Sequence, residues 1–159
     1  MKIEMNKLMV KRLQGKSIEE WIEKYPLARR LKTLLKSGLI EVDGKVFLSA
    51  FSKTRGHSAY EDQTGSEMFV NKFHIDNPGK KMSSGYYLQQ GLLFAFSLKD
   101  LLIKQFPGTS FKIIVNTDEG EDSFPDVCNV GFHKVRPGEF WLKPDLEGYK
   151  INGLLVITT

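Results

Sequence analysis

The apolar residues in the first part of the chain recur three or four positions apart, as they do along one face of an α-helix. They are Leu8, Met9, Leu13, Ile18, Trp21, Ile22, Leu27, Leu31, Leu34 and Leu35. Ser17 followed by Glu20 is typical of a capping box at a helix start, and Gly38 stands where a helix C-terminus is expected. This pattern predicts a helical segment over residues 1–38.

The hydrophobic pattern changes to that of strands at Leu39. In LIEVDGKVFLSAF two β-prone segments surround Asp43-Gly44, a dipeptide that strongly favours a tight hairpin. Residues 67–75, EMFVNKFHI, alternate so that Phe69, Phe73 and Ile75 share one face, which predicts a third strand. The segments SFKIIVNT, VCNVGFHKV and NGLLVITT predict three further strands near the C-terminus.

Between these two groups of strands, residues 86–106 predict one long helix. It is apolar over much of its circumference, which is typical of a helix buried against a sheet. Separate runs of helices and strands favour an α+β fold, with N-terminal helices and then a mainly antiparallel sheet packed on one long central helix. The length of 159 residues predicts a single domain, 1–159, with a helical subdomain (1–38) and an α+β core (39–159).

Composition bears on the cellular location of the protein. The longest strongly apolar stretch, residues 86–98, is shorter than the roughly 20 residues that a membrane span needs. The first residues, MKIEMNKLMVKRLQGK, lack the apolar core of a signal peptide. A single cysteine, Cys128, excludes an intramolecular disulfide and a cysteine-based zinc site. We therefore expect a cytoplasmic protein without a membrane segment.

Charge is distributed unevenly. Residues 1–53 hold 12 lysines and arginines and six acids, whereas residues 54–159 hold 11 and 13. Five acids lie between positions 118 and 126. Such asymmetry bears on the partners that a protein attracts rather than on its fold.

The most polar segment of the chain is TRGHSAYEDQTGSE, residues 54–67. Its Arg55, His57, Tyr60, Glu61 and Asp62 could supply a base, an acid and an anion contact. The simpler interpretation is a polar connection between two strands. Connections of this kind carry binding residues more often than cores do, so we predict contact with a partner here rather than catalysis.

No other pattern indicates catalysis, a metal or a cofactor. The chain lacks a phosphate-binding glycine loop and a nucleophile elbow, and its three histidines lack ligand spacing. Cys128 and His133 are five positions apart in a predicted strand and should point to opposite faces. We expect no enzyme, no metal and no cofactor, while a site assembled from distant residues such as His57, Glu61 and His133 stays open.

The basic helices leave a second function open. Three short helices followed by an Asp-Gly hairpin resemble a winged helix-turn-helix. In such a fold the basic side chains of the helices would face the phosphates of a nucleic acid. These basic residues are Lys11, Arg12, Lys16, Arg29, Arg30, Lys32 and Lys36. The same residues could be the solvated face of amphipathic helices, and nearby glutamates would repel a nucleic acid. Nucleic-acid binding is therefore the alternative prediction.

The C-terminal half resembles a known family. GYYLQQGLLFAFSLKDLLIKQFPGTSFKIIV, then CNVGFHKVRPGEFWLKPDLEGY and a final apolar strand, within residues 85–159, resemble bacterial toxin-immunity proteins, in particular those of contact-dependent growth inhibition systems. The resemblance implies a cytoplasmic protein that binds one cognate toxin tightly and is not an enzyme.

Many such toxins are nucleases with basic clefts, which an acidic loop would complement. The expected partner contacts form two groups. One is the acidic loop, with Asp118, Glu119, Glu121 and Asp122; the other is the polar segment, with Arg55, His57, Tyr60, Glu61 and Asp62.

Overall fold

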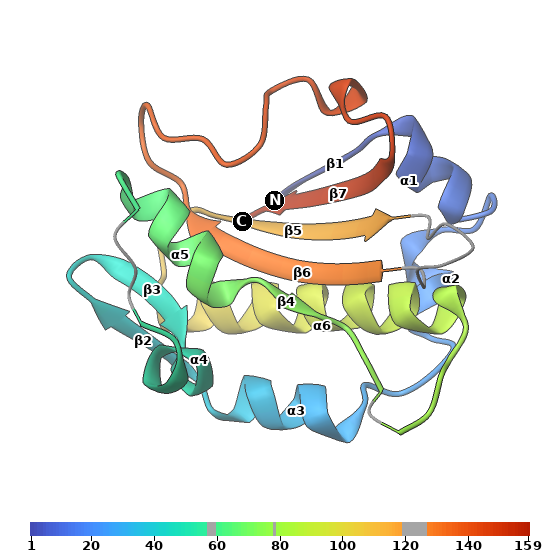
Figure 1. Cartoon of the computed structure of the whole chain (residues 1–159), viewed down its shortest axis with the longest axis horizontal. Helices are drawn as coiled ribbons and strands as arrows, with labels where there is room; N and C mark the ends of the chain where they lie inside the picture. Colours follow the sequence, from blue (N-terminus) through green and yellow to red (C-terminus); the bar gives the residue numbers. More distant parts are fainter. Residues whose placement is uncertain (57–59, 78, 119–126) are drawn as a thin grey trace.

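The computed structural model describes residues 1–56, 60–77, 79–118 and 127–159. An antiparallel sheet with the strand order β1-β7-β5-β6-β4 forms its centre (Figure 1). The strands are β1 (Lys2–Met5), β4 (Phe73–His74), β5 (Phe111–Asp118), β6 (Val127–Lys134) and β7 (Asn152–Thr158). The last three confirm the strands predicted near the C-terminus.

The predicted Asp-Gly hairpin is confirmed as a separate two-stranded sheet, β2 (Leu39–Val42) and β3 (Lys45–Leu48). Asp43 and Gly44 have positive φ angles of 50° and 75°. Both central residues of a type I′ turn need this conformation, and glycine adopts it without strain. The second strand ends at Leu48 because the next residues form a helix.

The helices surround this sheet on several sides. They are α1 (Lys7–Arg12), α2 (Ile18–Ile22), α3 (Arg29–Lys36), α4 (Ser49–Thr54), α5 (Gln63–Asn71), α6 (Ser84–Gln105) and the short 3-10 helix η1 (Leu146–Gly148). The capping box is confirmed at α2, where Ser17 and Glu20 exchange hydrogen bonds between side chain and backbone. The long helix α6 packs against the sheet, and α3 lies on the side of α6 away from the sheet (Figure 1). The predicted α+β class is thus confirmed.

One hydrophobic core joins the sheet, α6 and the N-terminal helices. Its buried members include Met9, Leu13, Trp21, Leu31, Leu92, Phe94, Leu98, Phe111, Ile113, Val130, Phe132, Leu155 and Ile157. Two buried glutamines of α6 hold the segment between α2 and α3. Gln89 Nε2 donates to the Tyr25 carbonyl at 2.8 Å, and Gln90 Oε1 accepts from the Ala28 N–H at 2.7 Å. The polar positions of this apolar helix therefore anchor the backbone that crosses it.

Two predictions about local structure are wrong. Residues 2–5 form a strand rather than part of a helix, because they pair with β7 at the other end of the chain. Of the strand predicted over residues 67–75, only Phe73 and His74 form a strand, the short β4, whereas residues 67–71 belong to α5. Segment 54–67 therefore connects helices α4 and α5 instead of two strands. The Asp62 carboxylate caps α5 by accepting from the Gly65 N–H at 2.6 Å. The buried face of α5 includes the polar residues Glu67 and Asn71, and this conceals its helical spacing in the sequence.

Those two residues lie one helical turn apart and fill the gap between β3 and β6. The Glu67 carboxylate accepts from the Val46 and Lys134 N–H groups at 2.7 and 2.8 Å. The Asn71 amide donates to the Val46 and Phe132 carbonyls at 2.9 and 3.2 Å. Side chains of α5 therefore bridge two strand edges that do not pair with each other.

The contact of α6 with β6 leads to a testable contrast between two glycines of the same helix. A Cβ at Gly91 would lie 2.7 Å from Cys128 Sγ, whereas a Cβ at Gly85 would meet only ordinary contacts at 3.7 Å or more. We expect Gly91→Ala to lower the free energy of unfolding by about 1–3 kcal/mol through overpacking. Gly85→Ala should raise it by about 0.5–1 kcal/mol through helix propensity. Urea denaturation measures both, and equal effects of the two variants would contradict this packing.

Candidate functional site

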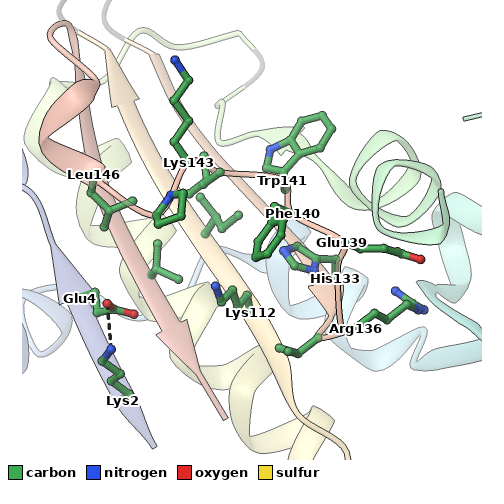
Figure 2. Close-up of a pocket in the computed structure, with 15 residues that line it drawn as sticks. Lys2, Glu4, Lys112, His133, Arg136, Glu139, Phe140, Trp141, Lys143 and Leu146 are labelled. Atoms are coloured by element: carbon green, nitrogen blue, oxygen red, sulfur yellow. Dashed lines mark ion pairs between the residues drawn. The ribbon is translucent and has the colours of Figure 1, made fainter. Parts of the chain in front are cut away.

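The connection from β6 to β7 crosses the outer face of the sheet, opposite α6, and encloses a cavity of about 250 Å³ (Figure 2). The sheet contributes the apolar Ile114 and Val156, and the connection contributes Leu146, Phe140 and Trp141. Charged residues lie around this apolar centre. They are Lys2, Glu4, Lys112, Arg136, Glu139 and Lys143, and the histidine His133 lies among them. We call this space the outer-face cavity.

His133 is the most buried titratable group of the cavity, with 3% of its surface exposed. Its Nδ1 lies 2.9 Å from the Lys134 carbonyl oxygen. A carbonyl can only accept, so Nδ1 carries the proton and donates, and Nε2 is the acceptor nitrogen of the neutral ring. Lys112 is the direct cross-strand neighbour of His133, and Figure 2 shows His133 beside the Phe140 ring.

Burial lowers the pKa of His133 from its ordinary value of 6.5. The nearby charges of Lys112 and Arg136 act in the same direction, while the hydrogen bond to Lys134 and the charge of Glu67 oppose them. The imidazole is therefore neutral at neutral pH.

This pKa shift predicts a pH dependence of stability. The unfolded chain binds a proton on His133 near pH 6.5 and the folded chain binds it only at lower pH, so stability falls as the pH drops below that value. We expect the free energy of unfolding to decrease between neutral pH and about pH 5.5, the region where an ordinary histidine titrates. In His133→Gln this decrease should be smaller. Urea denaturation across this range measures it, and equal slopes for both proteins would contradict the assignment to His133.

Arg136 fixes the start of the loop that covers the cavity. Its guanidinium forms a bidentate pair with the fully buried Glu67, at 2.7 and 2.9 Å, and Nη2 also donates to the Gly44 carbonyl at 3.0 Å. Burial acts to lower the pKa of Arg136, but its hydrogen bonds and the charge of Glu67 raise it above the ordinary value. This ion pair ties the loop to α5 and to the β2–β3 hairpin.

Next to the outer-face cavity lies an exposed surface of aromatic and acidic side chains. It comprises Tyr60, Glu61, Asp62, Phe69, Phe140 and Trp141, and we call it the aromatic-acidic surface. All of these except Phe69 line a second, shallow hollow together with Gly65. The Tyr60 and Phe69 rings lie 5.5 Å apart. Phe140 and Trp141 also line the outer-face cavity, so they separate the two hollows.

One hydrogen bond holds the two chain segments of this surface together. Glu139, next to Phe140, accepts from the Thr64 N–H at 2.9 Å in the first turn of α5. The contacts with Thr64 and the charge of Arg136 lower the pKa of Glu139, although burial acts in the opposite direction. The carboxylate is thus stabilised as the anion. Segments about 75 positions apart in the chain are joined at the point where the aromatic side chains are exposed.

The structure brings together three of the predicted contact residues, Tyr60, Glu61 and Asp62. Arg55 has a structural role instead. Its guanidinium carbon lies 4.0 Å from the centre of the Phe51 ring, and Nη1 donates to the Val70 and Lys72 carbonyls at the end of α5. His57 lies outside the described residues.

The predicted acidic loop is placed only in part. Asp118 is the last residue of β5, whereas Lys112, near the other end of this strand, lines the outer-face cavity. The two are about 20 Å apart at a rise of about 3.4 Å per residue. Asp118 therefore does not belong to the aromatic-acidic surface, which lies next to the cavity. Glu119, Glu121 and Asp122 lie outside the described residues. Phe69, Glu139, Phe140 and Trp141 were not among the predicted contacts. Two adjacent large aromatic residues in the Pro- and Gly-containing segment RPGEFWLKP were the signal that could have indicated them.

Cys128 and His133 lie on opposite faces of the sheet, as their spacing predicts. Cys128 is in the core against α6, and burial raises its pKa to about 12. In the part of the chain that the structure describes, no group of three histidine, cysteine or acidic side chains could hold a metal ion. Over the same ranges, no helix combines the length and the apolar character that crossing a membrane requires.

The basic residues predicted to contact nucleic acid are distributed over separate elements. α1 packs against β7, while α2 and α3 both pack against α6. Arg30 of α3 forms an ion pair with Asp76, and the Arg12 side chain lies against Gly153. This arrangement does not favour nucleic-acid binding over the alternatives, and that function stays a prediction.

The sequence profile of the family described as "Uncharacterized protein PM0498 family" matches residues 4–159. No curated protein and no solved structure matches the chain. The matched range includes every residue of the aromatic-acidic surface and all residues that line the outer-face cavity except Lys2.

Proposed function

The protein belongs to the PM0498 family, since the match spans nearly the whole chain, and we propose that it is an immunity protein that neutralises a cognate toxin in the cytoplasm by tight binding. In this proposal it is not an enzyme. The toxin contacts the aromatic-acidic surface, and the complex blocks the toxin's active site or the approach of its substrate.

The observation that carries this proposal is the exposure of four large aromatic side chains at one place. Tyr60, Phe69, Phe140 and Trp141 have 45%, 47%, 68% and 36% of their surface exposed. Exposed aromatic side chains lack the favourable free energy that burial would give them, and a partner protein can supply that burial. Groups of such side chains are typical of the central contacts of protein interfaces. Tyr60 and Trp141 also keep polar groups that can bond to a partner at the edge of the contact.

The charge of this surface favours a basic partner. Glu61 and Asp62 lie beside the aromatic rings in the same shallow hollow. Acidic groups next to an apolar contact speed the encounter with a positively charged protein and select against acidic ones. A nuclease toxin, whose substrate cleft is basic, fits this chemistry. The resemblance of residues 85–159 to toxin-immunity proteins supports the same partner and includes Phe140 and Trp141.

The proposal is tested with the product of the gene next to the one that encodes this chain. The neighbouring protein is expressed alone and with the chain, and cell growth and complex formation by isothermal titration are measured. We expect loss of growth with the neighbour alone, recovery with the chain, and a complex. A neighbour that forms no complex at micromolar concentration would contradict the proposal.

A control separates this function from the alternative. The chain is titrated with duplex DNA and with RNA at low and at physiological salt. A nucleic-acid-binding protein loses affinity steeply as salt rises, because each phosphate contact releases counterions. We expect no such binding, and steep salt-dependent binding in this control would favour the alternative.

A further inference from the structure

We propose that the outer-face cavity binds a small carboxylate with an apolar ring and a hydroxyl group, a role separate from toxin binding. The site consists of a cation and a hydrogen-bond acceptor on adjacent strands, next to an apolar part of the cavity lining. It needs no residue of a partner protein, so it can be tested on the isolated chain.

The charges of the cavity favour an anion. Four of its charged residues are already engaged: Lys2 and Glu4 pair with each other at 3.0 Å, Arg136 pairs with Glu67, and Glu139 accepts from the Thr64 N–H. The ammonium groups of Lys112 and Lys143 have no carboxylate within 4.0 Å in the described ranges. The charges left for a ligand are therefore both positive.

Lys112 is the better placed of the two cations. It is partly buried, whereas Lys143 is exposed, and its place opposite His133 in the sheet puts both side chains on the cavity face. A carboxylate bound in such a partly desolvated place forms a charge-assisted hydrogen bond, which is stronger than a neutral one.

His133 determines the second feature of the ligand. Its side chain is almost completely buried, its Nδ1 is occupied by the Lys134 carbonyl, and no described group bonds to Nε2. The neutral ring offers Nε2 to the cavity as an acceptor. In the described ranges only Thr64 Oγ1 is a buried side-chain nitrogen or oxygen atom without a hydrogen-bond partner, so Nε2 is open to the solvent of the cavity. A ligand hydroxyl can therefore donate to it in place of water.

The apolar lining residues and the volume of the cavity determine the size and the apolar character of the ligand. The apolar lining consists of Ile114 of β5 and Val156 of β7 from the sheet, and of Leu146, Phe140 and Trp141 from the connection above it. A volume of about 250 Å³ suits a ligand of one ring rather than a nucleotide. Inorganic phosphate would leave this apolar surface uncovered, so we expect a ring-bearing carboxylate to bind more tightly than phosphate.

The test uses 3- and 4-hydroxybenzoate, with benzoate, 4-hydroxybenzamide and inorganic phosphate as comparison probes. Affinity is measured by isothermal titration, and the site is located by NMR shifts of the Trp141 indole N–H and the His133 ring. We expect one hydroxybenzoate to bind at least about tenfold more tightly than 4-hydroxybenzamide and phosphate, the loss that removal of one charged hydrogen bond produces. Benzoate should bind with intermediate affinity.

Two variants complete the test. Lys112→Gln keeps a side chain of similar length and should weaken hydroxybenzoate binding by about tenfold or more. Lys32→Gln, an exposed lysine of α3, should leave it unchanged. The proposal is overturned if no probe shifts the Trp141 or His133 signals at millimolar concentration. It is also overturned if phosphate binds as tightly as hydroxybenzoate, or if the two variants behave alike.

Discussion

Glu67→Ala will lower the free energy of unfolding by about 3–5 kcal/mol, the range for removing one partner of a buried ion pair. Glu67 is fully buried, and its two oxygens accept four hydrogen bonds, two from Arg136 and one each from the backbone of Val46 and Lys134. Without the carboxylate, the Arg136 guanidinium keeps only backbone carbonyl partners, and the two N–H groups lose their acceptor. Urea denaturation at neutral pH measures the effect.

A matched control is available on the surface of the protein. Glu41 pairs with Lys134 at 3.6 Å, with 45% and 30% of the two side chains exposed. We expect Glu41→Ala to change stability by less than about 1 kcal/mol, as exposed pairs do. Glu67→Gln, which keeps the shape but not the charge, should fall between the two alanine variants. Equal effects of Glu67→Ala and Glu41→Ala would show that the buried pair does not hold α5 and the loop in place.

Tyr60→Ala and Trp141→Ala will each weaken toxin binding by about 30-fold or more, corresponding to the 2 kcal/mol that defines a central interface residue. Both rings line the hollow of the aromatic-acidic surface, one from each of its two chain segments. Each is partly exposed, so its removal takes away contact area without opening a cavity in the core. Isothermal titration with the cognate toxin measures the loss.

Tyr25→Ala is the control for Tyr60→Ala. The two tyrosines have almost the same exposure, 44% and 45%, and each ring packs against another aromatic ring, at 5.8 Å for Tyr25 and 5.5 Å for Tyr60. Tyr25 lies in the N-terminal part and should leave the affinity within about twofold, as peripheral contacts do. Loss of affinity in Tyr25→Ala, with none in Tyr60→Ala, would place the toxin on the other side of the molecule.

The elements that hydrophobic spacing predicts correctly are those whose buried faces are apolar. α6 is one such element, and β5 with its alternating Phe111, Ile113 and Val115 is another. α5 was misread because Glu67 and Asn71 occupy its buried face, where a pattern of apolar residues cannot show them. Residues 2–5 are wrongly predicted as helical because four residues are too few to show a hydrophobic period. They form the strand β1 because they pair with β7, about 150 positions away.

The candidate site could be predicted in part. The polar character of segment 54–67 indicated Tyr60, Glu61 and Asp62, which the structure places at an exposed hollow. Arg55 looks the same in the sequence but is held between Phe51 and the end of α5. Two adjacent aromatic residues in the loop segment RPGEFWLKP indicate that Phe140 and Trp141 could be exposed, but whether they are depends on the path of the loop, which only the structure shows.

The most direct test of toxin binding at the aromatic-acidic surface is amide hydrogen exchange of the chain, measured alone and in the presence of saturating toxin. We predict slower exchange on binding in peptides that cover residues 60–69 and 139–143. Exchange in α1, α2 and α3 should stay the same. Protection confined to the N-terminal helices or to the end of β5 at Asp118, with none at residues 139–143, would contradict the proposed binding surface.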